Sequence, residues 1–274
     1  MRGKALPLWT AISIAALAVQ PVLAFVPKPG PNLPQAGIPS DLSSPVREQI
    51  VKLYAKDAFV RAEAALVLGE MGSDAIGAIP YLVSMLDDDR GLTDIKRANV
   101  LLSRIEEKFP VAVAPGVFLE GMFVGDQAAI ALARIGTPAV EALIGALHNT
   151  AKDGFIIQKH WSNAAWALGR IGDPRAVEPL IGKLGVSWSP GTDPGLAPGE
   201  RGVYPSDAEV AAAAALGKIK DQRAILPLIF FMAKYGDEAA RVPAASALHD
   251  LTGESFGTDV AKWREWYKVH SGVQ

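Results

Sequence analysis

The sequence contains no cysteine among its 274 residues, which excludes disulfide bonds, thiolate metal sites and cysteine nucleophiles. Only four histidines are present, and none forms a His-x-x-His or His-Glu pair of the kind that metal sites use. Lys and Arg do not gather in runs and the formal charge is −2, so we expect no nucleic acid partner. No phosphate-binding glycine loop, nucleophile elbow or pair of catalytic carboxylates is recognisable. We therefore predict a protein that is not an enzyme and uses no cofactor or metal.

What the sequence does contain is an internal repeat, which is clearest in residues 163–184. Apolar residues recur at helical spacing before Asp173 and again after it, which predicts two short amphipathic helices folded into a hairpin. Asp173 can accept backbone hydrogen bonds at the entrance of the second helix. Pro179 does not fit a regular helix that starts at Pro174, so we interpret residues 174–176 as a tight turn.

Versions of this unit recur on both sides of the clearest one. The copies lie near residues 57–86, 127–147, 163–184, 208–232 and 241–253. Each copy has a leucine at the same place in its first helix, namely Leu68, Leu132, Leu168, Leu216 and Leu248. A single hairpin cannot bury both of its faces, so the core must form between stacked neighbours. We predict one elongated all-α domain over residues 44–274.

The string Ala-Leu-Gly-Arg-Ile-Gly-Asp-Pro-Arg-Ala-Val-Glu-Pro-Leu-Ile, at residues 167–181, resembles the HEAT-repeat family. Within that family it is similar to the bacterial repeats that look like those of phycobilin lyases. The resemblance implies a right-handed α-solenoid, a superhelix of stacked HEAT-like hairpins. It also implies a structural ladder between repeats, formed here by Asp173 with Arg175 and by Asp221 with Arg223. The motif does not indicate a function, because such repeats serve as interaction scaffolds in unrelated settings.

Residues 1–24 look like a secretory signal peptide, with a short basic start and an almost wholly apolar stretch after it. Val22 and Ala24 supply small residues at the positions that a signal peptidase reads. The alternative is an uncleaved membrane anchor, but prolines and a glutamine leave too short an apolar run for a comfortable span. We predict cleavage after Ala24, a secreted or periplasmic location, and no membrane span in the mature chain.

Both ends of the array need a cover, because a terminal repeat exposes an apolar face. Residues 25–43 are rich in proline and predict an extended linker. The helix that begins at Ser44-Pro45 should cover the first repeat. At the other end a helix over residues 259–269 should cover the last repeat with Trp263, Trp266 and Tyr267. The alternative interpretation of these three aromatic residues is a ligand site.

Two insertions, residues 148–162 and 185–206, fall between one hairpin and the next. In a stacked array they should emerge along the same edge, and insertions gathered on one face often mark a binding face. We predict a binding site there that consists of Trp188, Tyr204, Trp161, His160 and Phe155. Trp188 and Tyr204 are the expected anchors, because Trp and Tyr often dominate binding to a partner. The alternative is that both rings fold back and tie the loop to the solenoid.

Three further features each allow two interpretations. Residues 111–124 are too apolar to lie free in water, and we favour a loop folded onto the core over a binding patch. Arg134, Arg170 and Lys218 share one position in successive copies, and we favour solvated helix ends over a stripe that binds an anionic partner. Asp87-Asp88-Asp89 lacks the spacing and the glycine of a calcium loop, so we predict a solvated turn.

The sequence thus predicts an exported HEAT-repeat protein that acts as a non-catalytic scaffold and binds a protein partner. Two other functions remain open. One is a chromophore-handling protein similar to phycobilin lyases, against which export argues, because chromophore attachment to phycobiliproteins takes place inside the cell. The other is a carbohydrate-binding module that uses the loop aromatics Trp161, Trp188 and Tyr204.

Overall fold

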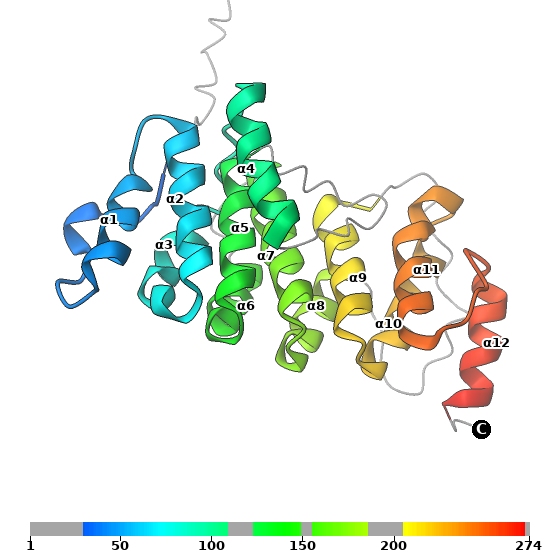
Figure 1. The fold of residues 1–274 in the computed structure, drawn as a ribbon. Helices are drawn as coiled ribbons and strands as arrows, with labels where there is room; N and C mark the ends of the chain where they lie inside the picture. Colours follow the sequence, from blue (N-terminus) through cyan, green and yellow to red (C-terminus); the bar gives the residue numbers. More distant parts are fainter. Residues whose placement is uncertain (1–29, 109–122, 149–154, 186–204, 272–274) are drawn as a thin grey trace, which may run out of the picture.

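Figure 1 shows an elongated stack of helix pairs in a computed structural model, which describes residues 30–108, 123–148, 155–185 and 205–271. The first helices of the pairs are α2 (Ala58–Met71), α5 (Val124–Ile135), α7 (Phe155–Ile171), α9 (Asp207–Ile219) and α11 (Glu238–Thr252). The second helices of the first four pairs are α3 (Ile79–Val83), α6 (Val140–His148), α8 (Val177–Lys183) and α10 (Ile225–Lys234), and α11 is followed by α12 (Val260–His270). Within these described ranges there is no strand, and one isolated bridge joins Gly91 to Phe123. The chain is an all-α solenoid of stacked hairpins, as predicted.

Short 3-10 turns join the two helices of each pair at the lower side of Figure 1. These turns are η2 (Gly72–Ala78), η3 (Thr137–Ala139), η4 (Pro174–Ala176) and η5 (Gln222–Ala224). At η4 the Arg175 amide donates to Asp173 Oδ1 over 2.9 Å. Because α8 begins only at Val177, Pro179 falls in its first turn, where a backbone N–H has no partner within the helix. The predicted tight turn is therefore confirmed.

Arginines in these turns link one repeat to the repeat before it. Arg175 donates to Asp173 in its own turn and, through Nη1, to Glu141 Oε1 of the preceding pair over 2.7 Å. Its hydrogen bonds to the carboxylate hold the pKa of Asp173 below the usual value. Arg223 repeats this arrangement with Asp221, and its Nη2 donates to the Pro174 carbonyl over 3.1 Å. The structure thus contains the ladder that the resemblance implied; because its ion pairs are exposed, it sets register more than stability.

The glycine that follows the repeated leucine lets the first helices of neighbouring pairs approach closely. The five repeated leucines are fully buried. A Cβ atom added at Gly169 would lie 2.6 Å from the Ala215 Cα atom of the next repeat. A Cβ atom added at Gly69 would lie 2.7 Å from the Ala131 Cα atom, and one added at Gly217 would lie 2.7 Å from the Ala247 Cα atom. Alanine cannot occupy such a position without moving a helix.

Gly169→Ala should lower the free energy of unfolding by about 1–3 kcal/mol, which urea denaturation measures. The reason is that overlap with Ala215 outweighs the roughly 1 kcal/mol that alanine gains over glycine in a helix. Gly145→Ala in α6 is the matched control, because no described atom lies within 4 Å of the added methyl group. It should raise stability by up to about 1 kcal/mol. Equal effects of the two substitutions would contradict the close approach.

Both ends of the stack are covered by a helix. At the start, α1 (Ser44–Lys52) has proline in its first turn and buries Val46 and Ile50. At the end, α12 (Val260–His270) begins at Asp259, whose carboxylate accepts from the Ala261 and Lys262 amides. Trp263 is fully buried, and its Nε1 donates to the Gly257 carbonyl over 2.8 Å. In the structure Trp263 is therefore part of the core, which agrees with the capping interpretation.

The proline-rich segment is bound to the first repeat over the part that is described. The Tyr54 hydroxyl donates to the Leu33 carbonyl over 2.8 Å, and the Tyr81 hydroxyl donates to the Gly37 carbonyl over 3.1 Å. Between these contacts the chain forms a short turn, η1 (Gln35–Gly37). Residues 30–43 therefore pack on the solenoid, whereas the sequence analysis predicted a linker over residues 25–43. Proline does prevent a helix here, but the carbonyl groups still accept hydrogen bonds from tyrosine.

One additional helix, α4 (Ile95–Lys108), lies between the first two pairs in sequence and packs against α2. Asp94 Oδ1 accepts from the Lys96 and Arg97 amides at its start. Ala98, Leu101 and Ile105 recur on one side of the helix and are buried. Residues 109–122, which make up most of the predicted apolar segment, lie outside the described residues.

Candidate functional site

The predicted binding site belongs to the edge where one helix pair leads into the next. We call this the inter-repeat edge; it consists of the first residues of α5, α7 and α9 and the last residues of α6 and α8. These helices lie side by side in Figure 1, so the described ends of both insertions meet at this edge. Phe155 is the first residue of α7. Trp188 and Tyr204, the predicted anchors, lie outside the described residues.

Trp161 lies near this edge, nearly two turns into α7. Its side chain is half-buried and packs against the core. The Lys183 Nζ atom, at the end of α8, lies 3.5 Å from the centroid of the indole ring. Burial lowers the pKa of Lys183. A cation above an indole face is attracted by about 0.5–2 kcal/mol, so this contact orders both side chains.

His160 lies beneath the inter-repeat edge, with only 2 % of its surface exposed. Its Nδ1 atom is 3.9 Å from Asp87 Oδ1. The sequence analysis placed this histidine on the binding face because Trp161 stands next to it. Neighbouring residues on a helix point in different directions, so His160 faces inward while Trp161 stays at the surface.

His160 is part of a set of buried polar residues near the starts of α2 and α5, in the middle of α7 and in the segment after α3. Among the described residues, the buried polar and charged side chains are Arg61, Asp87, Asp88, Asp126, Gln127, His160 and Asn163. We call these seven residues the polar cluster. Burial of charge costs free energy unless the charge is paired, and the ion pairs of Arg61 with Asp88 and of Asp126 with Lys159 supply that pairing.

Arg61 and Asp88 form a buried ion pair within the polar cluster. Arg61 Nε donates to Asp88 Oδ2 over 2.9 Å, and Nη2 donates to Oδ1 over 3.3 Å. Arg61 Nη1 also donates to the Ala55 and Lys56 carbonyls, at 2.9 and 3.0 Å. Asp88 Oδ2 accepts in addition from the Gly30 amide over 3.3 Å. One ion pair thus joins α2, the segment after α3 and the proline-rich segment.

This arrangement corrects the prediction of a solvated turn at Asp87-Asp88-Asp89. Asp87 and Asp88 are buried, and only Asp89 is exposed. The physical reason is the arginine at position 61, which is remote in sequence and neutralises Asp88 in the interior. The second helix α3 also ends early, at Val83, so the chain turns back over α2 here instead of continuing into solvent.

The rest of the polar cluster holds the segment after α3 against the second and third pairs. Asn163 Nδ2 donates to the Leu86 carbonyl over 2.8 Å, and the Gly125 amide donates to the Asp88 carbonyl over 2.9 Å. Asp126 lies 2.8 Å from Lys159 Nζ. Burial raises the pKa of the Asp126 carboxyl, and Lys159 opposes that shift. This geometry fixes backbone positions at the inter-repeat edge.

Arg134, Arg170 and Lys218 share one position in the repeat and were predicted to be solvated at helix ends, but the structure shows this only for the last of them. Arg134 is almost wholly covered and lies 4.0 Å from Glu70 Oε1. Arg170 lies 5.8 Å from the centroid of the Trp166 ring. Burial lowers the pKa of both arginines. Only Lys218 fits the prediction, since it is exposed and donates to Asp250 over 2.7 Å.

Within the part of the chain that the structure describes, no group of three or more His, Asp or Glu side chains could hold a metal ion. Comparison with protein-family models finds three matches to the family described as PBS lyase HEAT-like repeat, at residues 60–88, 162–184 and 210–234. These ranges coincide with the pairs α2–α3, α7–α8 and α9–α10. No curated protein matches the chain.

Proposed function

We propose that this chain, which is a HEAT-like repeat protein, is an exported scaffold without catalytic activity that binds a protein partner at its inter-repeat edge. The observation that supports this most is the place of the insertions. Both interrupt the array between one pair and the next, where the described helix ends meet at one edge. A solenoid presents such an edge as a long continuous surface, and per-repeat insertions on it often carry binding.

Trp188 and Tyr204 are the proposed anchors, and Trp161, at the described part of the edge, is proposed as a further contact. Their insertion is rich in Pro, Gly and Ser and carries two large aromatic residues. Aromatic anchors that enter a partner's pocket supply a large share of binding free energy. The polar cluster supports this role, because it holds the backbone beneath the edge in place and a preorganised surface loses less entropy on binding.

Replacing Trp188 and Tyr204 together by Ser should leave the melting temperature unchanged and weaken partner binding by roughly 2 kcal/mol or more. The partner is the protein that the mature chain retains from the cell envelope of its host, and affinity is measured on that purified pair. Lys220→Ser with Gln222→Ser, at the opposite edge, is the matched control and should change neither quantity. A large loss of stability with binding intact would show that the two rings only tie down the loop.

The proposed export requires removal of residues 1–24, which lie outside the described residues. We expect the mature chain to begin at Phe25, because Val22 and Ala24 are the small-residue pair that follows the apolar run. Intact-mass measurement on protein from the native host tests this. Recovery of the chain with residues 1–24 still attached would contradict export by this route.

The matching family description names a PBS lyase, so a role in handling a chromophore is the second candidate. We propose the scaffold over this role because export would separate the protein from intracellular phycobiliproteins. A bilin added to the purified mature chain should therefore show no change in its absorption spectrum. A shifted spectrum at equimolar protein would favour the chromophore-handling role.

A further inference from the structure

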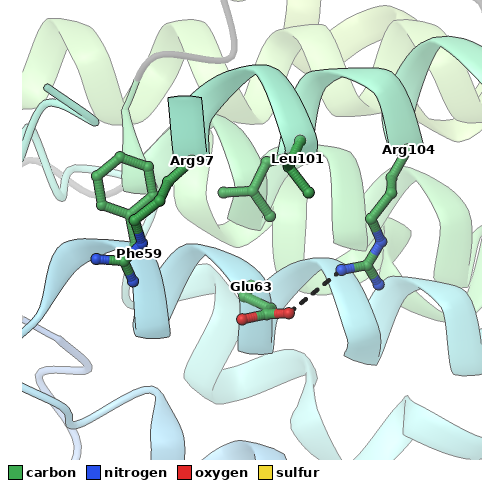
Figure 2. A pocket seen from close by; sticks show the side chains of 6 residues that line it. Phe59, Glu63, Arg97, Leu101 and Arg104 are labelled. Atoms are coloured by element: carbon green, nitrogen blue, oxygen red, sulfur yellow. Dashed lines mark hydrogen bonds and ion pairs between the residues drawn. The ribbon is translucent and has the colours of Figure 1, made fainter. Parts of the chain in front are cut away.

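A pocket lies between α2 and α4 (Figure 2). Its volume is about 200 Å³, and its lining consists of Phe59, Glu63, Arg97, Val100, Leu101 and Arg104. Pockets for drug-sized ligands occupy about 300–1,000 Å³, so this one is too small for a chromophore or a similar molecule. It has the size to receive one large side chain of a peptide.

Arg97 stands at one end of the pocket and is held in place from two sides. Its Cζ atom lies 4.3 Å from the centroid of the Phe59 ring, and its Nη1 donates to Asp57 Oδ2 over 3.0 Å. A guanidinium group has five N–H donors, and this bond uses one of them. The Arg97 side chain is 47 % exposed. It is thus a positioned cation with donors to spare at the surface.

Arg104 stands at the other end of the pocket, seven residues and about 10 Å further along α4. Its donors are more fully used, because Nη2 donates to Glu70 over 2.9 Å and Nη1 donates to Glu63 over 3.5 Å. Figure 2 shows Leu101 between the two arginines. The carboxylate-binding capacity of the pocket therefore lies mainly at the Arg97 end.

One exposed apolar side chain of α4, Val100, stands at the pocket. Val100, in the pocket lining, is 63 % exposed, and Ile95, the first residue of α4, is 71 % exposed but lies five residues away on another side of the helix. These are two of the three most exposed large apolar side chains among the described residues. Exposed apolar surface beside a positioned arginine is complementary to a segment that carries both an apolar side chain and a negative charge.

We propose that this pocket binds a segment of the partner protein in which a bulky apolar residue stands beside an Asp or Glu. The apolar side chain packs on Val100 and on the small parts of Phe59 and Leu101 that line the pocket, and the carboxylate accepts hydrogen bonds from Arg97. An arginine fork suits a carboxylate, with which it can form two parallel hydrogen bonds. The inference rests on the proposed function in one respect, namely that the ligand belongs to a protein partner.

Selection from a library of random twelve-residue peptides displayed on phage tests the proposal with the mature chain, residues 25–274. Each peptide is fused to the coat protein at its C-terminus, so its only carboxylates are Asp and Glu side chains. The enriched peptides should share a bulky apolar residue next to an acidic one. A synthetic, C-terminally amidated copy of one of them should bind Arg97→Gln at least about tenfold more weakly than the unchanged chain.

Arg223→Gln is the matched control, because Arg223 is 48 % exposed and is also paired with an aspartate. It should bind the peptide with unchanged affinity. The Arg97 pair with Asp57 is exposed and contributes little to stability, so Arg97→Gln should keep its melting temperature. Changing the acidic residue of the peptide to its amide should weaken binding as much as Arg97→Gln does.

The proposal is overturned if no peptide family is enriched, or if Arg97→Gln binds the enriched peptides as tightly as the unchanged chain. A further outcome separates it from the proposed function. Peptides that lose binding on replacement of Trp188 and Tyr204, but not on Arg97→Gln, would show that partners bind the inter-repeat edge alone. That result overturns the pocket and leaves the scaffold role intact.

Discussion

Replacing Arg61 by Met should lower the free energy of unfolding by about 3–5 kcal/mol, as expected when one partner of a buried ion pair is removed. The substitution leaves the buried carboxylate of Asp88 without its counter-ion. It also removes the donor to the Ala55 and Lys56 carbonyls. Urea denaturation followed by circular dichroism measures the change. A loss below about 1 kcal/mol would mean that water reaches the pair.

Two controls separate the loss of the ion pair from a general effect of the substitution. Arg61→Met combined with Asp88→Leu removes both charges, and it should recover part of the stability because no unpaired charge stays buried. Lys218→Met removes a cation from an exposed pair with Asp250, and it should cost less than about 1 kcal/mol. If the double variant is no more stable than Arg61→Met, the cost lies in the hydrogen bonds that Arg61 and Asp88 make to the backbone.

Leu168→Ala should lower the free energy of unfolding by about 2–5 kcal/mol, because it leaves a cavity in the middle of the stack. Leu168 is fully buried in α7, which packs against α5 on one side and α9 on the other. A cavity there weakens contacts with two neighbouring repeats at once, and each repeat in a solenoid depends on its neighbours. Urea denaturation of the mature chain again provides the measurement.

The matched control for Leu168→Ala is Leu251→Ala near the end of α11, where the side chain is only half-buried. The cost there should be smaller, because less apolar surface returns to water and solvent can fill the space. Equal costs at the two positions, or a change at Leu168 of less than about 1 kcal/mol, would place Leu168 outside the core of the array.

The helix pairs, their turns and the inter-repeat ladder could be predicted because the chemistry that specifies them is local. Leu168 marks a buried helix face by its spacing from other apolar residues. Asp173 binds the amide of Arg175, two residues away, so the turn depends on a short stretch of chain. The same holds for α12, which starts at the capping residue Asp259 and buries Trp263. The repeats also made the helix pairs easier to predict, because a residue pattern that recurs in several copies marks the same helix and turn in each of them.

The polar cluster and the pocket could not be predicted in the same way. Asp88 is buried because of Arg61, and Asn163 is buried because it binds the Leu86 carbonyl; both partners are remote in sequence. The acidic triplet therefore looked solvated, and His160 looked like a surface residue. The pocket needs α4 to pack against α2, and α4 lies in the departure between two copies, where the repeat pattern gives no alignment.

Crosslinking mass spectrometry in the native cell envelope tests most directly whether this protein is a scaffold that binds a partner at its inter-repeat edge. Lys183 lies at that edge, and Lys152 stands in the insertion between α6 and α7. Lys218 and Lys220 lie at the opposite edge, beside η5. An amine-reactive reagent should join the partner to Lys152 or Lys183. Crosslinks to a partner through Lys218 and Lys220 alone would contradict the account.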